Sequence, residues 1–300
     1  MRAIILVGGF GTRLRPLTNE KPKQILNVGN KTMLENVIEN LSNHKVTEVI
    51  LSMGFQPSAF VDAYPNGMCG GLPLKYVVEP TPLDTAGAIG FSALESSVNE
   101  TFLVCNGDVI AETDISELVD FHRDAGAEAT ISLTPTDNPS QYGIVPTDEH
   151  GQVTGFIEKP SGPHFETNMI NAGYYVMEPS VLGRIASNRP SSVETEIFPQ
   201  MVEDKTLYAV PSETYWIDAG IPETFLQANL DLLNGVRGEK INGVHEQASV
   251  GSNAVVKLSM IGKGVKIADG AHVENSVLLD GVEVEKNARI EGSIVGERAK

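Results

Sequence analysis

The chain has 300 residues, and its 22 Lys and Arg against 39 Asp and Glu give a formal net charge of −17 at pH 7. A chain of this length buries enough surface to fold from its core alone, and Cys69 and Cys105 lack disulfide or metal-site spacing, which favours a reducing, cytoplasmic setting. The acidic balance disfavours nucleic-acid and anionic-lipid surfaces, and the first apolar run, Ala3–Val7, is too short for a signal peptide or a membrane span.

Over the first 235 residues or so, short β-branched runs alternate with amphipathic helical patterns. This alternation predicts an α/β fold with a Rossmann-like, mostly parallel sheet covered by helices on both faces. Ligands of such sheets gather where the strands end. Thr113 or Asp114 is the expected cap of the last predicted helix. The predicted strands are Ala3–Val7, Glu48–Ser52, Lys75–Val78, Phe102–Cys105 and Ala129–Leu133, and the predicted helices are Thr32–Leu41, Thr85–Leu94 and Ile115–His122.

The pattern changes after Gly235, where an aliphatic residue recurs every six positions with two steps of five. Hexapeptide repetition is typical of a parallel β-helix whose coils bury the repeated residue. We therefore expect a catalytic domain over residues 1–235 and a short left-handed parallel β-helix over 241–300. The tail shows no polar cap, so either the repeat is truncated or another subunit covers it, and a homo-oligomer is expected. The predicted interior residues are Val250, Val256, Ile261, Ile267, Val273, Leu279, Val284 and Ile290.

A glycine-rich segment, GGFGTRLRP, directly follows the first predicted strand. Glycines let backbone N–H groups approach phosphate oxygens closely. The segment is neither a P-loop nor GxGxxG, and a solvent-exposed strand-to-helix turn is the plain alternative. Arg13 and Lys23 favour the phosphate interpretation, because two cations beside a glycine loop in an acidic chain suit a polyphosphate.

The segment GGFGTRLRPLTNEKPKQIL resembles the signature of sugar-1-phosphate nucleotidyltransferases, the nucleoside-diphosphate-sugar pyrophosphorylases. Four further pieces, CNGDV, FIEKP, INAG and YWIDAG, resemble the same family and stand in its order. The closest resemblance is to mannose-1-phosphate guanylyltransferases, through NGDV, INAGYYVMEPSVL and SSVETEIFPQMVEDKTLYAV. Gln24, Thr32 and Asp84 depart from the usual pattern. The departure at Asp84 bears on the identity of the substrate more than on the type of reaction.

This resemblance implies transfer of a nucleotidyl group from a nucleoside triphosphate to a hexose-1-phosphate, with GTP and mannose-1-phosphate as the leading pair. The reaction needs no general base, because a phosphate monoester has its second pKa near ~6 and is already ionised. It does need charge neutralisation, which Mg²⁺ held by one or two carboxylates supplies. Asp108 and Asp218 are the candidate ligands, although an Asp after a strand is also a common turn former or cap.

The resemblance also implies a nucleotide-binding role for Gly87 and a sugar-binding role for Lys159. The plain alternatives are a helix-start glycine for Gly87 and an ordinary surface lysine for Lys159. A glucose-1-phosphate thymidylyl- or uridylyltransferase and a non-catalytic regulatory subunit that binds sugar nucleotides stay open, whereas a bifunctional acyltransferase would need more coils. The candidate residues are, for catalysis, Arg13, Lys23, Asp108, Lys159 and Asp218; for the nucleotide, Leu6, Gly8, Gly9, Gly11, Thr12, Arg13, Gly87 and Asp108; and for the sugar, Glu158, Lys159, Asn171 and Gly173.

Overall fold

The computed structural model describes residues 1–54, 56–161, 166–187, 189–238 and 240–300. The chain forms two compact units, each discontinuous in sequence. Within those ranges, no helix combines the length and apolar character that crossing a membrane requires. The first unit comprises Met1–Gly9 and Val37–Trp216, and the second comprises Phe10–Asn36 and Ile217–Lys300.

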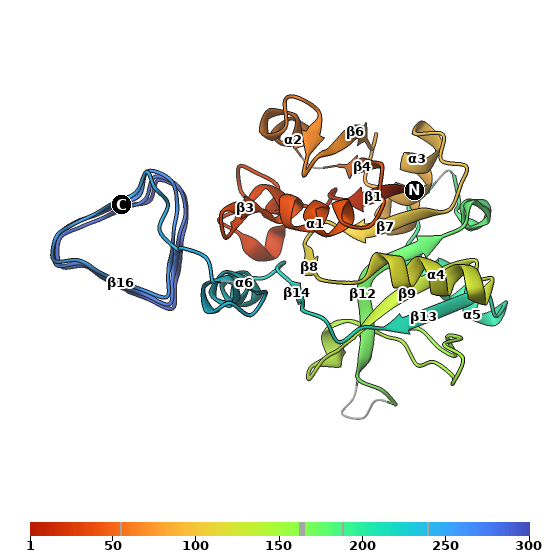
Figure 1. Cartoon of the computed structure of the whole chain (residues 1–300). Coiled ribbons are helices and arrows are strands. Elements are labelled where there is room, and N and C mark those ends of the chain that lie inside the picture. Colours follow the sequence, from red (N-terminus) through yellow and green to blue (C-terminus); the bar gives the residue numbers. More distant parts are fainter. Residues whose placement is uncertain (55, 162–165, 188, 239) are drawn as a thin grey trace. The chain divides into compact units, whose positions relative to one another are not determined.

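The first unit is built on a mixed sheet with a parallel centre (Figure 1). Its strands are β1 (Arg2–Leu6), β4 (Glu48–Met53), β5 (Met68–Cys69), β6 (Leu72–Val78), β7 (Phe102–Asn106), β9 (Ala129–Pro135), β10 (Gly143–Ile144), β11 (Ile157–Glu158), β12 (Met169–Met177) and β13 (Leu207–Pro211). The order is β11-β10-β12-β7-β1-β4-β6-β5, with β9 pairing with both β12 and β13. Strands β7, β1, β4 and β6 are mutually parallel, whereas β12 runs antiparallel to β7. The predicted parallel sheet is confirmed at its centre.

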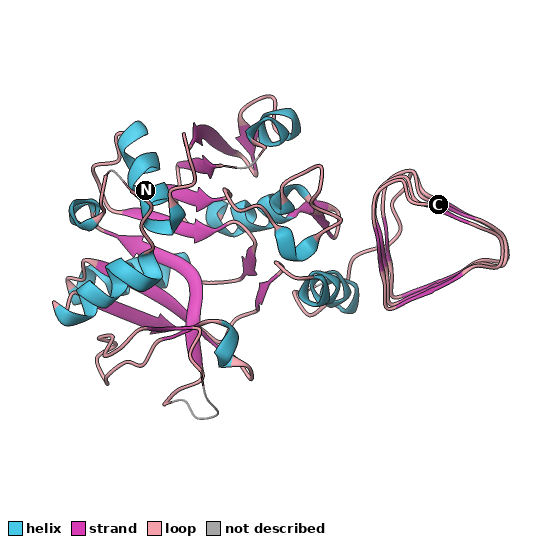
Figure 2. Cartoon of the chain, turned by 180° about the vertical axis from the view of Figure 1, so that it is seen from behind, coloured by secondary structure: helices cyan, strands magenta, loops and turns pink. Residues whose placement is uncertain are grey.

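The parallel strands are apolar because both of their faces are covered. Ala3, Ile4 and Ile5 of β1 are fully buried. Figure 2 shows helices packed along the strands, with α3 against β1 and β4, and α4 against β9, β12 and β13. Every predicted strand and helix exists, with ends shifted by at most three residues. The helices are α2 (Pro57–Ala63), α3 (Asp84–Glu95), α4 (Ile115–Ala125) and α5 (Phe198–Glu203), while α1 (Met33–Ser42) crosses the boundary between the two units.

Helix α4 shows how local chemistry fixes an element. Oδ1 of Asp114 accepts hydrogen bonds from the backbone N–H groups of Ser116 and Glu117, at 2.9 and 3.0 Å. Asp114 is therefore the cap, and Thr113 is not. The helix ends at Gly126, whose φ of 59° is the left-handed conformation that glycine adopts most readily.

The second unit contains two short strands, β2 (Asn27–Val28) and β3 (Lys31–Thr32), and helix α6 (Pro222–Asn234). The buried side chain of Asn229 on α6 accepts a hydrogen bond at 2.9 Å from the N–H of Gly29, in the β2–β3 turn. Nη1 of Arg237 donates to Oδ1 of Asn36 at 3.0 Å. These bonds tie the segment before residue 36 to the helix that precedes the tail.

The tail consists of stacked coils whose strands form three parallel sheets, seen as a triangle in Figure 1. Each coil takes 17 residues, because Ile261 pairs with Leu278 and Ile267 with Val284. This arrangement is β-helix-like and agrees with the hexapeptide pattern. The strands are β15 (Ser249–Val250), β16 (Val255–Lys257), β17 (Met260–Ile261), β18 (Lys266–Ile267), β19 (His272–Glu274), β20 (Val277–Leu278), β21 (Glu283–Val284), β22 (Arg289–Glu291) and β23 (Ile294–Val295).

Two of the predicted interior residues, Val250 and the buried Leu279, lie outside the inner cluster. Val250 is 42% exposed, because its strand β15 belongs to the first coil and pairs only with β18. Leu278 and not Leu279 occupies the inner cluster, because the 17-residue repeat places Leu278 over Ile261. The other predicted residues are in that cluster or pack against it: Val256, Ile261, Ile267, Val273, Val284 and Ile290.

The two valines Val273 and Val250 provide a test of this interior. Val273 is fully buried, so Val273→Ala should lower the free energy of unfolding by about 2 kcal/mol through lost burial and a cavity. Val250→Ala, at the exposed position, should change it by less than about 0.5 kcal/mol. Urea unfolding of both variants measures the difference, and equal effects would contradict the inner position of Val273.

Candidate active site

The loops after β1, β4 and β6 meet at the carboxyl edge of the parallel strands. The N–H of Val7 donates to the carbonyl of Ser52 at 3.0 Å, and the N–H of Glu79 to that of Met53 at 2.8 Å. A Cβ on Gly8 would lie 3.0 Å from Oε1 of Glu79 and 3.2 Å from the backbone N of Gly54. Gly8 is therefore closely packed, and it begins the glycine segment at the edge where ligands of such sheets bind.

Glu79 belongs to this edge, although no motif in the sequence pointed to it. Its Oε1 accepts a hydrogen bond from the Ser52 hydroxyl at 3.3 Å, and its Oε2 accepts one from the N–H of Leu83 at 3.1 Å. Each carboxylate oxygen has two lone pairs, so acceptor capacity remains. Its distance from Gly8 is visible only in the folded chain.

Gly87 lies in the first turn of α3, where the packing is tight. Its N–H donates to the carbonyl of Ser191 at 3.1 Å, as does that of Ala86 at 2.8 Å. A Cβ on Gly87 would lie 2.9 Å from Cβ of Leu83. This shows a structural requirement for glycine at the position, and the nucleotide-binding role of Gly87 stays a prediction.

Asp108 lies in the turn between β7 and β8 (Val109–Ala111), and it is partly exposed. The N–H of Gly107 donates to the carbonyl of Leu6, the last residue of β1, at 3.1 Å. This bond places the Asp108 turn beside the end of β1, the strand that Gly8 and Gly9 follow. The first unit therefore brings Gly8, Gly9 and Asp108 to one edge, where the backbone carbonyl of Leu6 accepts the bond from Gly107.

The predicted sugar residues lie on β11, directly after it, and on β12, in the same unit. Nζ of Lys159 forms an ion pair with Oε1 of Glu158 at 3.0 Å. Oδ1 of Asn171 accepts from the N–H of Gly173 at 2.9 Å, and its Nδ2 donates to the Tyr175 hydroxyl at 2.9 Å. The register of β12 against β9 shifts between Asn171 and Tyr175. This irregularity sets the conformation of the NAG segment.

Gly173 connects these residues with the Asp108 turn. Its φ is 76°, and a Cβ there would lie 2.7 Å from Nδ2 of Asn106. Asn106 is the last residue of β7, two positions before Asp108. The predicted residues Gly8, Asp108 and Gly173 thus follow one another along β1, β7 and β12.

The second unit holds Gly11, Thr12, Arg13 and Lys23. Gly11 has a φ of 60°, and its carbonyl accepts from the Thr18 hydroxyl at 2.7 Å. A Cβ on Gly11 would lie 3.5 Å from Cβ of Lys23, so the glycine loop adjoins this lysine. Thr12 and Arg13 are exposed on the following 3₁₀ turn, Thr12–Leu14. The two predicted cations therefore flank the loop within one unit.

Asp218 also lies in the second unit, at the end of β14 (Trp216–Asp218) and shortly before α6. Its Oδ1 accepts from the N–H of Gly220 at 2.8 Å. Asp108 belongs to the first unit, so the pairing of the two carboxylates stays a prediction. Across the described ranges, no group of three or more His, Cys, Asp or Glu is placed to hold a metal ion.

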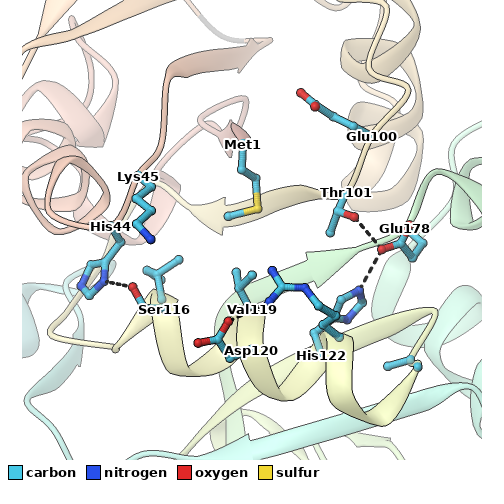
Figure 3. A pocket seen from close by; sticks show the side chains of 14 residues that line it. Met1, His44, Lys45, Glu100, Thr101, Ser116, Val119, Asp120, His122 and Glu178 are labelled. Atoms are coloured by element: carbon cyan, nitrogen blue, oxygen red, sulfur yellow. Dashed lines mark hydrogen bonds and ion pairs between the residues drawn. The ribbon is translucent and has the colours of Figure 1, made fainter.

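A cavity of about 640 Å³ lies at the opposite, amino edge of the parallel strands, and Figure 3 shows its side chains. Helix α4 forms one wall. Nε2 of His122 lies 3.2 Å from Oε1 of Glu178, which also accepts from the Thr101 hydroxyl at 2.6 Å. Nδ1 of His44 lies 3.1 Å from the Ser116 hydroxyl. The cavity contains no predicted site residue, and these polar groups bond to one another.

His122 makes stability depend on pH. Burial lowers its pKa, although the hydrogen bond with Glu178 partly offsets this. The unfolded chain, with an imidazole pKa of about 6.5, therefore binds the proton more tightly than the folded chain does. Stability should fall as the pH drops below about 6.5. His122→Gln, which cannot titrate, should lose less melting temperature between about pH 7.5 and 5.5 than the parent protein, and equal losses would contradict this role.

The comparisons with known proteins agree with this geometry. The family model "Nucleotidyl transferase" matches residues 2–235, and "GMPPB C-terminal domain" matches residues 240–300. The "Mannose-1-phosphate guanylyltransferase" of Mycobacterium tuberculosis is 37% identical over 92% of this chain and 79% of that protein. The "Mannose-1-phosphate guanyltransferase" of Saccharomyces cerevisiae is 37% identical over 85% of this chain and 71% of that protein.

Two solved structures share the fold. A glucose-1-phosphate thymidylyltransferase from Bacillus anthracis, described as putative and in complex with a sucrose, has a TM-score of 0.69 at 24% identity, over 81% of this chain and 96% of that one. HddC from Yersinia pseudotuberculosis, complexed with GMP-PN, has a TM-score of 0.65 at 27% identity, over 76% of this chain and 97% of that one. With the family model matched over most of its length, the chain belongs to the nucleotidyl transferase family.

Proposed function

We propose that the chain catalyses the reaction of GTP with mannose-1-phosphate to give GDP-mannose and pyrophosphate. The Mycobacterium tuberculosis and Saccharomyces cerevisiae relatives, which are named for this reaction, are each 37% identical over 92% and 85% of the chain. The structural observation that carries the proposal is the continuity of one edge. Gly8 follows β1, Asp108 follows β7, and Gly173 adjoins Asn106. This continuity of Gly8, Asp108 and Gly173, which are predicted to bind the nucleotide or the sugar, supports the proposal.

The chemistry suits these residues. An oxygen of the sugar phosphate attacks the α-phosphorus of GTP, the bond from that phosphorus to the β-phosphate bridging oxygen breaks, and pyrophosphate leaves with the electron pair. The nucleophile is already ionised, since its second pKa is near ~6. The protein must therefore position two anions and offset their charge.

We assign the charge-offsetting roles as follows. Arg13 and Lys23, beside the glycine loop, would hold the triphosphate, and Lys159 would hold the sugar phosphate. Asp108 and Asp218 fit Mg²⁺, because carboxylate oxygens are the ligands that this ion takes in proteins. When bound, Mg²⁺ neutralises phosphate charge in the transition state.

Glu79 is our candidate for base selection. Guanine presents two adjacent N–H donors, and a carboxylate can accept from both. Glu79 lies against Gly8, and hydrogen bonds from Ser52 and Leu83 fix its orientation. A fixed acceptor pair of this kind disfavours bases that present one N–H between two carbonyls.

The tail and its setting complete the proposal. We propose that the coils form a left-handed β-helix over residues 241–300, that residues 1–235 are the catalytic domain, and that the enzyme works in the cytoplasm as a homo-oligomer. The first coil supports the last point, because β15 and β16 each pair on one side only and Val250 is exposed.

The test is a matrix of four nucleoside triphosphates against mannose-, glucose- and N-acetylglucosamine-1-phosphate, scored by pyrophosphate release with Mg²⁺. The GTP and mannose-1-phosphate pair should give the highest kcat/KM. Higher turnover with dTTP or UTP and glucose-1-phosphate would replace the proposal with the thymidylyl- or uridylyltransferase alternative. No release from any pair would favour a non-catalytic subunit.

A further inference from the structure

A short segment after β12 is fastened to the first turn of α3. The N–H groups of Ala86 and Gly87 both donate to the carbonyl of Ser191, and the N–H of Ser191 donates to the carbonyl of Leu83 at 3.0 Å. The N–H of Val193 donates to the Thr85 hydroxyl at 2.8 Å. The segment that follows is therefore held rigidly beside the turn that begins α3.

This segment continues as a π-helical turn, Val193–Ile197, which contains Glu194. Such turns occur often at functional sites. Oε2 of Glu194 accepts from the Thr85 hydroxyl at 2.6 Å and from the Ser192 hydroxyl at 2.9 Å. Both hydroxyls in turn accept a backbone N–H, from Val193 and Thr195. Their protons therefore point to Glu194, and the orientation of its carboxylate is fixed.

The other carboxylate oxygen of Glu194 has capacity left. Oε1 of Glu194 accepts no hydrogen bond from the described residues. This oxygen is also not completely buried. Glu194 is half-buried. A fixed, half-buried carboxylate that presents one accessible oxygen is suited to accept a hydrogen bond from a ligand.

Tyr175 connects Glu194 with the predicted sugar residues. Its hydroxyl accepts from Asn171, and its ring packs against Phe198, just after the π-helical turn, with centroids 5.2 Å apart. Burial raises the pKa of Tyr175, and the negative charges of Glu194 and Glu158 raise it further. The carboxylates of Glu194 and Glu158 therefore both act on the Tyr175 hydroxyl, which Asn171 contacts directly.

We propose that Oε1 of Glu194 accepts a hydrogen bond from a hydroxyl of the sugar phosphate and, together with Glu158, determines which hexose-1-phosphate reacts. This inference rests on the proposed function. Hexose-1-phosphates differ in the direction of single hydroxyl groups, and a rigid acceptor distinguishes those directions. A site built to bond a hydroxyl rejects an analogue that cannot supply it. The bonds from Thr85 and Ser192 provide that rigidity before substrate binds.

Glu194→Gln tests this role because it changes the hydrogen-bonding character of the group that faces the substrate. The hydroxyls of Thr85 and Ser192 must still donate, so the amide oxygen will face them and the NH₂ group will face the substrate. An acceptor then becomes a donor with almost no change in shape. The matched control is Glu196→Gln on the same turn, whose carboxylate pairs with Arg189 at 2.5 Å and not with Thr85.

The measurements are KM for mannose-1-phosphate, glucose-1-phosphate and GTP, with the melting temperature. For Glu194→Gln we expect KM for mannose-1-phosphate to rise about tenfold or more, KM for GTP to change less than about twofold, and the kcat/KM ratio of the two sugars to change. Glu196→Gln should behave like the parent enzyme. Should Glu194→Gln fail to fold, Glu194→Asp, which keeps the charge but withdraws the oxygens, should show the same separation of the sugar and GTP values.

Two results would overturn the inference and leave Glu194 as a structural link. One is an equal change in KM for GTP and for mannose-1-phosphate. The other is an unchanged KM for mannose-1-phosphate together with an unchanged kcat/KM ratio of the two sugars. Failure of the proposed function is distinguishable, because it shows first in the parent enzyme. If the parent prefers another sugar phosphate, the same comparison is made with that substrate. If the parent releases no pyrophosphate, equilibrium binding of mannose-1-phosphate replaces KM, and equal affinity of parent and Glu194→Gln refutes the role.

Discussion

Asp108→Asn should lower kcat by about two to three orders of magnitude while leaving the fold intact, since one charge-stabilising group is lost from the transition state. A neutral amide holds Mg²⁺ poorly, and the turn between β7 and β8 is fixed independently by the bond from Gly107 to Leu6. Asp218→Asn should have a similar effect. The measurement is pyrophosphate release at saturating substrates over a Mg²⁺ titration.

Asp114→Asn is the matched control for this experiment. Asp114 lies six residues after Asp108 and caps α4 through two backbone N–H groups. Asn is an equally good cap, so this variant should keep both its stability and its turnover. Near-normal kcat of Asp108→Asn at saturating Mg²⁺ would remove Asp108 from the metal site. Loss of turnover in Asp114→Asn as well would show that the effect of Asp108→Asn is not specific to a metal site.

The parallel centre of the sheet could be predicted from the sequence because its strands bury both faces. Continuous apolar runs such as Ala3–Val7 then differ clearly from the amphipathic helices between them. The start of α4 was also predictable to within one residue, since Thr113 and Asp114, the two candidate caps, precede an apolar period, and the structure selects Asp114. Strands β10 and β11 were not predicted, because two residues each carry no periodicity. Their pairing depends on β12, which runs against the parallel strands.

The candidate site likewise contains residues that the sequence could identify and residues that it could not. Glycines and charged residues in ordered motifs, such as Gly8 and Asp108, could be chosen from the sequence because their types and spacing carry the chemistry. Glu79 and Glu194 could not, since a single glutamate has no distinctive pattern. Their assignment needs the distance from Glu79 to Gly8 and the bond from Thr85 to Glu194. The inner position of Leu278 likewise needs the 17-residue coil, which pairs it with Ile261.

Gly173→Ala should be the most damaging of the glycine replacements near the site. Its φ of 76° is left-handed, which costs an L-residue about 1–2 kcal/mol. A Cβ would also lie 2.7 Å from Nδ2 and 3.1 Å from Cγ of Asn106, so the side chain of Asn106, at the end of β7, must move. The total loss of stability should be about 3 kcal/mol. Turnover should fall too, because Asn106 leads into the Asp108 turn.

Gly126→Ala separates the two causes. Gly126 has a φ of 59°, also left-handed, but a Cβ there would meet nothing within 4 Å. It should therefore show the backbone cost alone, about 1 kcal/mol, with kcat unchanged. Urea unfolding and pyrophosphate release on both variants make the comparison. If Gly173→Ala loses no more stability than Gly126→Ala and keeps its kcat, the close approach of Gly173 to Asn106 does not order the Asp108 turn, and the continuity of the edge across β7 and β12 has no catalytic consequence.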